Sequence, residues 1–515
     1  MYKILSKIGK VLFHRLGIAG VLIIAQIALY AAGLIVLRDS QYYKLVEWLF
    51  ISLSVLAAMW IVGDKSNPGY KIGWIIIVLG LMPFGSLAYL LLGGNHLSSF
   101  NQRRLRSMER KISKNLSAEC ERSAVLGKLL GEDAACMARY LEQTTCCPVY
   151  GNTRTKYYPL GDDCYNDILA ALWDAERYIF IEYFIIEEGQ LWNSILDILK
   201  DKAQHGVEVR VIYDDIGSIS TLPSDYPAKL EKLGVHCQVF GRLMPVVSLR
   251  LNNRDHRKYM IVDGRVAFTG GINMADEYIN VKPRFGHWKD SAIRLEGDAV
   301  WSMTVSFLSM WDFTHSGEEH FTPFRPAPAG GGAQGYVQPY HDCPWDNEAV
   351  GQSVYLNLIY RAKEYIYITT PYLVIDYSLT VALTTAAKSG VDVRIITPHI
   401  PDKKTVFELT RSHYEELLEA GVKVFEYEPG FIHSKNFVVD GRFATVGTVN
   451  LDYRSMFLHF ENGVLLYETP SVAAIREDFL DTQSKSLAIT LEDCRSISLP
   501  HRLLRDLLRL FAPLL

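Results

Sequence analysis

The chain has 515 residues, a length typical of about three or four structural units, and 49% of its residues are hydrophobic while 21% are charged. This composition excludes a disordered or fibrous protein. The formal net charge of −4 argues against a dedicated nucleic-acid-binding protein, which usually carries a strongly basic domain.

Three long apolar segments lie near the N-terminus. Segments 17–37 and 72–92 contain no charged residue, and segment 45–62 contains only Glu47. About 20 helical residues span the ~30 Å apolar core of a bilayer. We therefore expect residues 1–95 to form an N-terminal membrane region with these three segments as transmembrane helices. A cleaved signal peptide is the alternative for the first segment, but that segment is long and two more follow it.

Basic residues flank this region on both sides. They are Lys3, Lys7, Lys10 and Arg15 before it, and Arg103, Arg104, Arg106, Arg110, Lys111 and Lys114 after it. The positive-inside rule then places both ends in the cytoplasm. Two cytoplasmic ends require an even number of crossings, so one segment is re-entrant or interfacial, or the N-terminus departs from the rule. We expect a multi-pass membrane protein with a cytoplasmic catalytic region, joined by a basic, helical connector over 96–150.

From residue 151 onward the sequence alternates between strand and helix patterns. Residues 178–181 and 207–212 are predicted strands, whereas 167–175 and 230–233 are predicted helices. Such alternation favours an α/β fold with a mainly parallel sheet.

The alternating pattern occurs twice, which indicates a duplication. Residues 175–181 resemble 362–368, and residues 205–212 resemble 389–396. A segment rich in Pro and Gly over 323–345 reads as a linker between the copies. We therefore predict a first domain over 151–322 and a second over 346–515.

Each half carries the same polar signature near its end. The first copy consists of His256, Lys258, Asp263, Gly270 and Asn273, and the second of His433, Lys435, Asp440, Gly447 and Asn450. The spacing is identical in both: His-x-Lys, four residues, Asp, six residues, Gly, two residues, Asn. One such motif arises easily by chance, but two in the same register of matching repeats indicate a shared function.

These residue types suit reactions at a phosphodiester. On a strand, residues two apart share one face, so His and Lys converge. An imidazole attacks phosphorus or transfers a proton near neutral pH, and an ammonium neutralises a phosphate oxygen. Two such sets supply a nucleophile, an acid and two cations. We therefore expect the chemistry to need no metal and no cofactor.

The duplicated His-x-Lys-x₄-Asp motif resembles that of the phospholipase D superfamily, and the similarity is greatest to the bacterial cardiolipin synthases. Further similar segments are 67–93, 215–218, 253–258, 370–372, 447–455 and 511–515. The resemblance implies two tandem phospholipase D-like α/β units packed as a pseudo-twofold pair, preceded by N-terminal transmembrane helices. The chain differs from many relatives in its extra apolar segment 17–37 and in Gly270-Gly271, where Gly-Ser is common.

The resemblance also implies roles for individual residues. His256 would be the nucleophile and His433 the acid and base, with the reverse assignment left open. Four residues would hold the non-bridging phosphate oxygens: Lys258, Lys435, Asn273 and Asn450. Asp290 and Glu461 would orient the motif histidines. The motif residues Asp263 and Asp440 would stabilise loops or strand pairs without touching phosphate.

The implied activity is reversible phosphatidyl transfer between two phosphatidylglycerol molecules at the bacterial cell membrane, giving cardiolipin and glycerol through a phosphohistidine. Alternatives are a hydrolytic phospholipase D, a membrane-tethered nuclease and an inactive lipid-binding scaffold, and phosphatidylethanolamine remains open as the second lipid. We expect no nucleic-acid partner. A basic amphipathic C-terminal helix with Arg502, Arg505 and Arg509 would lie on anionic membrane lipid or, alternatively, pack on the protein core.

Overall fold

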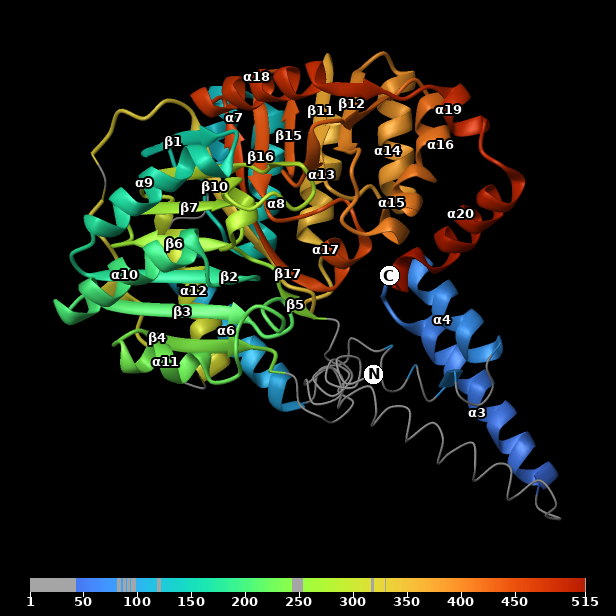
Figure 1. The fold of residues 1–515 in the computed structure, drawn as a ribbon, viewed down its shortest axis with the longest axis horizontal. Coiled ribbons are helices and arrows are strands. Elements are labelled where there is room, and N and C mark those ends of the chain that lie inside the picture. Colours follow the sequence, from blue (N-terminus) through green and yellow to red (C-terminus); the bar gives the residue numbers. More distant parts are fainter. Residues whose placement is uncertain are drawn as a thin grey trace, which may run out of the picture. The chain divides into compact units, whose positions relative to one another are not determined.

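The computed structural model describes residues 43–80, 85–86, 89, 93, 99–117, 122–242, 253–315, 319–328 and 330–514. The chain divides into two compact units (Figure 1). One contains the N-terminal helices, and the other contains both halves of the repeated pattern. The duplicated halves therefore share one structural unit.

The described N-terminal unit contains helices α3 (Tyr43–Gly63) and α4 (Pro68–Gly80). They fall on the predicted helix 45–62 and on the first part of 72–92, whereas segment 17–37 lies outside the described residues. Many large apolar side chains of α3 are exposed, including Leu49, Leu56, Met59 and Trp60. Within the described part of the chain, no helix has both the length and the apolar character needed to cross a membrane.

Three helices connect this unit to the first half: α6 (Ser99–Leu116), α7 (Arg122–Leu130) and α8 (Glu132–Thr145). They cover the predicted helical connector. Leu105, Met108 and Ile112 of α6 are buried in the same hydrophobic core as helix α12 (Val300–His315). The connector is therefore packed onto the first half of the duplication.

The first half forms a seven-stranded sheet in the order β1-β9-β7-β6-β2-β3-β4. Its strands are β1 (Thr153–Tyr158), β2 (Tyr178–Tyr183), β3 (Glu208–Asp214), β4 (His236–Phe240), β6 (Tyr259–Val262), β7 (Val266–Gly270) and β9 (Ala292–Gly297). Its helices, besides α12, are α9 (Gly161–Trp173), α10 (Gln190–Gln204) and α11 (Tyr226–Lys232).

The second half repeats this topology in a sheet ordered β10-β17-β16-β15-β11-β12-β13-β18. Its strands are β10 (Tyr336–Asp342), β11 (Tyr365–Thr369), β12 (Asp392–Pro398), β13 (Lys423–Tyr427), β15 (Asn436–Val439), β16 (Phe443–Gly447), β17 (His459–Tyr467) and β18 (Ser486–Ala488). Its helices are α13 (Val350–Arg361), α14 (Tyr377–Lys388), α15 (Lys404–Arg411), α16 (Tyr414–Glu419), α17 (Tyr453–Phe457), α18 (Pro470–Ser484), α19 (Leu491–Arg495) and α20 (Leu499–Phe511).

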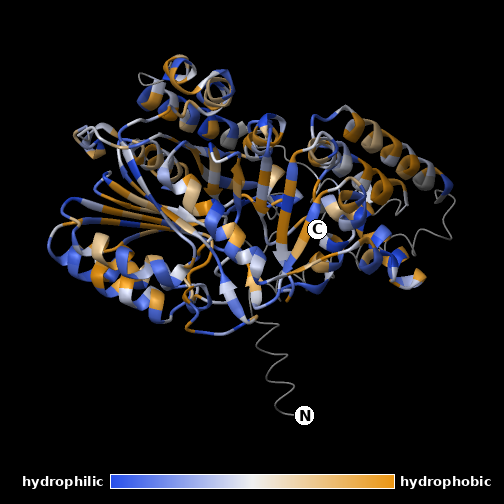
Figure 2. Ribbon diagram, turned by 90° about the horizontal axis from the view of Figure 1, so that it is seen from above, coloured by the Kyte–Doolittle hydropathy of each residue, from blue (hydrophilic) through white to orange (hydrophobic). Residues whose placement is uncertain are grey.

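Apart from β18, the two sheets have the same strand order, as a duplication requires. Apolar residues are concentrated on the strands and on the helix faces that cover them (Figure 2). Strand β2 is buried along its whole length, and β11 is buried except at its first residue. The prediction of a duplicated α/β fold is therefore confirmed.

Two details of the prediction are wrong. Along the two strand orders, parallel pairing occurs only in β2-β3-β4 and β11-β12-β13, whose successive strands are joined by helical crossovers, while the other neighbours in each order are antiparallel. The predicted linker 323–345 is also shorter, because residues 336–342 form β10 on the edge of the second sheet. An edge strand tolerates its internal proline, Pro339.

Candidate active site

Two short parallel strand pairs join the halves at the motif histidines. Strand β5 (Arg254–Asp255) pairs with the start of β17, and β14 (Gly430–Ile432) pairs with β8 (His287–Lys289). The backbone pairing extends to the histidines, since His256 N donates to Phe460 O at 2.9 Å and His433 N donates to Lys289 O at 2.7 Å. Each motif therefore begins beside a strand of the opposite half.

The strand pairing between the halves places each predicted acid beside the histidine of the other half. The Nδ1 atom of His256 lies 3.0 and 2.9 Å from the two carboxylate oxygens of Glu461. The Nδ1 atom of His433 lies 2.6 Å from Oδ2 of Asp290. A carboxylate accepts hydrogen bonds, so Nδ1 carries the proton and Nε2 is the unprotonated nitrogen of a neutral ring.

The site is buried, and its electrostatics follow from that burial. Desolvation, followed by the charges of Lys258 and Lys435, holds the pKa of His256 well below its usual value. Burial and Lys435 lower the pKa of His433 to about 4, although Asp290 opposes the shift. Both imidazoles are therefore neutral at pH 7. A bound phosphate anion would favour the protonated form of one of them.

The two motif lysines are also buried and are partly held by their own motifs. Lys258 Nζ donates to His256 O at 2.7 Å, and Lys435 Nζ lies 2.9 Å from His433 Nδ1 and also contacts His433 O. Burial lowers the pKa of Lys258 to about 7 and that of Lys435 to about 8. The His-x-Lys segments lie between strands, not within one as expected.

The two predicted asparagines are buried but differ in their contacts. Asn273 accepts from the backbone N of Ile185 at 3.1 Å and donates to Tyr278 Oη at 2.7 Å. Asn450 Oδ1 is buried and has no hydrogen-bond partner among the described residues. Each amide therefore keeps some hydrogen-bonding capacity: an N–H in Asn273 and the carbonyl oxygen in Asn450.

Asp263 and Asp440 occupy equivalent places at the tip of a hairpin. Asp263 accepts from the backbone N of Glu176, Arg177 and Tyr178 at 2.8–2.9 Å. Asp440 accepts in the same way from residues 363, 364 and 365 at 2.7–2.9 Å. Both residues have a positive φ, as has the glycine that follows each, which is the geometry of a type I′ turn. Each aspartate thus fixes its hairpin to the start of a central strand.

Replacing Asp263 by Ala is expected to lower the free energy of unfolding by about 2–4 kcal/mol, because three backbone donors lose a charged acceptor. The fraction that remains folded should keep its activity, since no contact links this carboxylate to the histidines. Thermal unfolding and turnover per folded molecule are the measurements. A variant with full stability but no turnover would contradict the structural role.

Gly271 and Thr448 occupy equivalent positions in the two halves, and their side chains differ for a steric reason. The Thr448 hydroxyl donates to Glu461. A Cβ atom on Gly271 would lie 2.0 Å from Oδ1 of Asp290. The first half therefore has no room for a hydroxyl residue at this position unless Asp290 moves.

Gly271→Ala is expected to reduce activity by about 10²-fold, because displacing Asp290 by an ångström disturbs His433. Gly330→Ala is a suitable control, since a Cβ atom there would have no neighbour within 4 Å. Steady-state turnover of both variants tests this expectation. Wild-type activity of Gly271→Ala would show that Asp290 has space to adjust.

Several aromatic residues around the histidines were not identified from the sequence. Tyr278, Trp288 and Phe431 have ring centroids 5.6, 5.6 and 5.8 Å from that of His433. On the other side, the ring of His459 lies 5.6 Å from that of His256. Trp288 and His459 each stand two residues before an orienting acid. Their matching positions in the two repeats were the sequence signal that could have identified both residues as part of the site.

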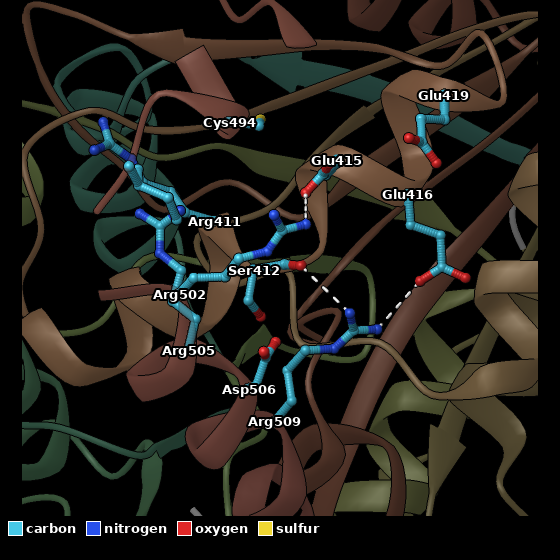
Figure 3. A pocket seen from close by; sticks show the side chains of 11 residues that line it. Arg411, Ser412, Glu415, Glu416, Glu419, Cys494, Arg502, Arg505, Asp506 and Arg509 are labelled. Carbon is cyan, nitrogen blue, oxygen red and sulfur yellow. Dashed lines mark hydrogen bonds and ion pairs between the residues drawn. The ribbon is translucent and has the colours of Figure 1, made fainter. Parts of the chain in front are cut away.

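The basic C-terminal helix α20 packs against protein, and its three arginines form ion pairs there, although only Arg505 is buried while Arg502 and Arg509 remain exposed. Arg502 contacts Glu415 and Arg509 contacts Glu416 (Figure 3). Arg505 contacts Glu408. These glutamates belong to α15 and α16. The exposed residues of α20 also include five leucines: Leu499, Leu503, Leu504, Leu507 and Leu510. Ion pairs with the neighbouring helices hold the three arginines on the side of α15 and α16.

Known proteins resemble the chain over most of its length. A family model described as "Cardiolipin synthase, PLD-like domain" matches residues 168–282 and 355–482. A second, described as "Phospholipase D-nuclease N-terminal", matches residues 52–94. The two matches of the first model fall in the two halves of the duplication.

Individual relatives cover nearly the whole chain. An uncharacterised protein of Streptococcus mutans is 42% identical over 463 residues, which cover 89% of this chain and 99% of that protein. A cardiolipin synthase of Alkalihalophilus pseudofirmus is 32% identical over 505 residues, covering 96% of this chain and 99% of that enzyme. The crystal structure of a phosphatidylserine synthase of Haemophilus influenzae matches with a TM-score of 0.55 at 16% identity, covering 73% of this chain and 97% of that one, which supports the fold alone.

Proposed function

The chain belongs to the bacterial cardiolipin synthases of the phospholipase D superfamily, and on this basis we propose that it transfers a phosphatidyl group between two phosphatidylglycerol molecules to give cardiolipin and glycerol. One observation above all supports the mechanism. Two histidines from different halves each have Nδ1 held by a carboxylate, which leaves two Nε2 atoms for the reaction.

In the first step, Nε2 of His256 attacks phosphorus and the bond from phosphorus to the glycerol oxygen breaks. The leaving alkoxide needs a proton, and the imidazolium of His433 supplies it from Nε2. The products are free glycerol and a phosphatidyl group bonded to His256. Glu461 stabilises the positive charge that develops on the His256 ring.

In the second step, the now neutral His433 takes the proton from the terminal hydroxyl of another phosphatidylglycerol. The resulting oxygen attacks phosphorus, and the bond to His256 breaks. Cardiolipin leaves and His433 is again protonated, so the cycle balances without a cofactor. Because the two steps together replace one alkoxide at phosphorus by another, the transfer is reversible.

The remaining motif residues would stabilise charge on the phosphoryl oxygens. Lys258 and Lys435 supply cations, and the amide of Asn273 supplies a donor. Asn450 would supply a second amide donor if its side chain turns from Asp452, to which it is hydrogen-bonded. We assign Asp263 and Asp440 to the hairpin tips and not to the phosphate.

We further propose that the enzyme works at the bacterial cell membrane. The exposed apolar side chains of α3 support this location, because a long apolar surface is unfavourable in water. A multi-pass arrangement with a cytoplasmic catalytic unit remains a prediction from the sequence, as does the expectation that no nucleic acid binds. Anionic lipid remains a proposed partner, although the arginines of α20 are paired within the protein.

Incubation of the purified full-length enzyme with phosphatidylglycerol alone tests the proposal. We expect cardiolipin and glycerol in equal amounts by mass spectrometry, and added glycerol should convert cardiolipin back to phosphatidylglycerol. Phosphatidic acid as the main product would instead identify a hydrolase. Adding phosphatidylethanolamine in a parallel reaction shows whether a second lipid serves as donor or acceptor.

A further inference from the structure

Three side chains with metal-ligand atoms meet on the Nδ1 side of His256. They are His256, His459 and Glu461, and one ligand atom from each lies within 4.8 Å of the other two. Glu461 connects the group: its Oε2 is 2.9 Å from His256 Nδ1, and its Oε1 is 3.6 Å from His459 Nδ1. Among the residues that the structure describes, this is the one such group of three.

The spacing suits a small transition-metal ion. In a tetrahedral zinc site with bonds of about 2.0–2.1 Å, neighbouring ligand atoms lie roughly 3.3 Å apart. The two measured separations lie on either side of this value. Two imidazoles and one carboxylate also form a common zinc ligand set, whereas magnesium and calcium prefer all-oxygen sites.

His459 has a nitrogen that the fold leaves available. Its Nδ1 is buried without a hydrogen-bond partner within normal distance, and the nearest acceptor is Glu461. Its Nε2 accepts a long bond of 3.5 Å from Arg454 Nε. The side chain is only 11% exposed, so this nitrogen has little access to bulk water. Because Nε2 accepts this bond, the neutral ring carries its proton on Nδ1, and a cation between His459 and Glu461 can use Nδ1 once that proton moves to Nε2.

The other half of the duplication provides an internal contrast. Trp288 occupies the place of His459, and its ring lies 5.6 Å from His433, the same separation as between His459 and His256. Tryptophan offers no metal ligand, so His433 and Asp290 supply only two. Both halves therefore have a ring packed beside the motif histidine, but only the group around His256 has a third metal ligand, His459.

We propose that His256, Glu461 and His459 form an inhibitory binding site for Zn²⁺, with one coordination position left for water. Metal bonding at Nδ1 of His256 moves the ring proton to Nε2. That nitrogen then has no lone pair with which to attack phosphorus. Each ring stays neutral, so no net proton is released. The inhibition rests on the proposed function, whereas the binding does not.

Two features limit the affinity. Zinc at His459 Nδ1 places a proton on Nε2, so the bond from Arg454 is lost. The buried ammonium groups of Lys258 and Lys435 repel a cation. We therefore expect a reversible regulatory or inhibitory site that chelators empty, and not a permanently occupied structural site.

Isothermal titration calorimetry of the full-length protein with ZnCl₂ tests the binding directly. We expect one ion per chain in the wild type and none in His459→Phe, which keeps a ring but no nitrogen. His236→Phe is the matched control, since His236 lies 3.2 Å from Glu231 at the surface and has no third ligand. Thermal unfolding verifies that each variant is folded, and His459→Asn replaces the phenylalanine variant if the latter is not.

The second measurement is cardiolipin formation with and without zinc, expressed relative to the zinc-free rate of each variant. Zinc should inhibit the wild type and His236→Phe by more than tenfold, and a chelator should restore both, whereas His459→Phe should lose this sensitivity. Failure of the wild type to bind zinc, or equal binding by His459→Phe, would overturn the site. Absence of turnover with phosphatidylglycerol would instead count against the proposed function, and calorimetry would still decide on the zinc site.

Discussion

His256→Ala and His433→Ala are each expected to lower cardiolipin formation by at least about 10⁴-fold, because each removes an imidazole that no other residue replaces. Both side chains are buried at the junction of the two halves, and each is bonded to one carboxylate. Mass spectrometry of the products measures the loss. Circular dichroism and thermal unfolding provide the control that the variants are folded.

The two variants should differ when the leaving group is changed. Phosphatidyl-p-nitrophenol releases a weakly basic phenolate that needs no proton. His433→Ala should therefore still form a phosphatidyl adduct on His256, and the adduct should persist because no base activates the incoming hydroxyl. His256→Ala should form no adduct. Peptide mapping identifies the modified residue, and an adduct on His433 would reverse the assignment of nucleophile and acid.

Asp290→Asn and Glu461→Gln are expected to reduce turnover by about 10²- to 10⁴-fold, because each removes the charge that orients a histidine and stabilises its protonated form. Each substitution should impair the histidine of the opposite half. Asp290 raises the pKa of His433, so Asp290→Asn lowers that pKa further and weakens the acid. Glu461→Gln instead disturbs the nucleophile. Steady-state rates with both substrates measure the effects.

The p-nitrophenol substrate separates these two variants. Asp290→Asn should recover most of its rate of adduct formation, because that step no longer needs the acid, whereas Glu461→Gln should remain slow. Asp290→Asn combined with His433→Ala should be no slower than His433→Ala alone, since both changes act through one residue. The opposite pattern would mean that each acid serves the histidine of its own half.

Much of the site could be predicted from the sequence because its residues repeat. The motifs around His256 and His433 match in spacing, and the acids Asp290 and Glu461 follow at similar distances. That each acid contacts the histidine of the other half could not be predicted. The partners are 205 and 143 positions apart and come together only when β5 pairs with β17 and β14 with β8. Local patterns carry no information on such pairing.

The remaining differences also have physical causes. Strands β6 and β7 are joined by a tight hairpin, and the connection from β7 to β9 contains no α-helical crossover, so these strands are antiparallel although their composition resembles that of the parallel ones. The direction of the α20 arginines depends on Glu408, Glu415 and Glu416, which lie about 90 residues earlier and whose position the helix pattern does not encode. His459 was overlooked because a lone histidine in a strand pattern indicates nothing specific.

The exchange of acids between the halves also determines when the enzyme becomes active during its synthesis. His256 leaves the ribosome long before Glu461, which is 205 positions downstream. At 5–20 residues per second, about 10–40 s separate the two. Throughout this interval the nascent chain displays a nucleophile whose carboxylate has not yet been made. The polypeptide therefore stays inert through this interval, and reactivity begins only after Glu461 has been synthesised and its strand has paired with β5.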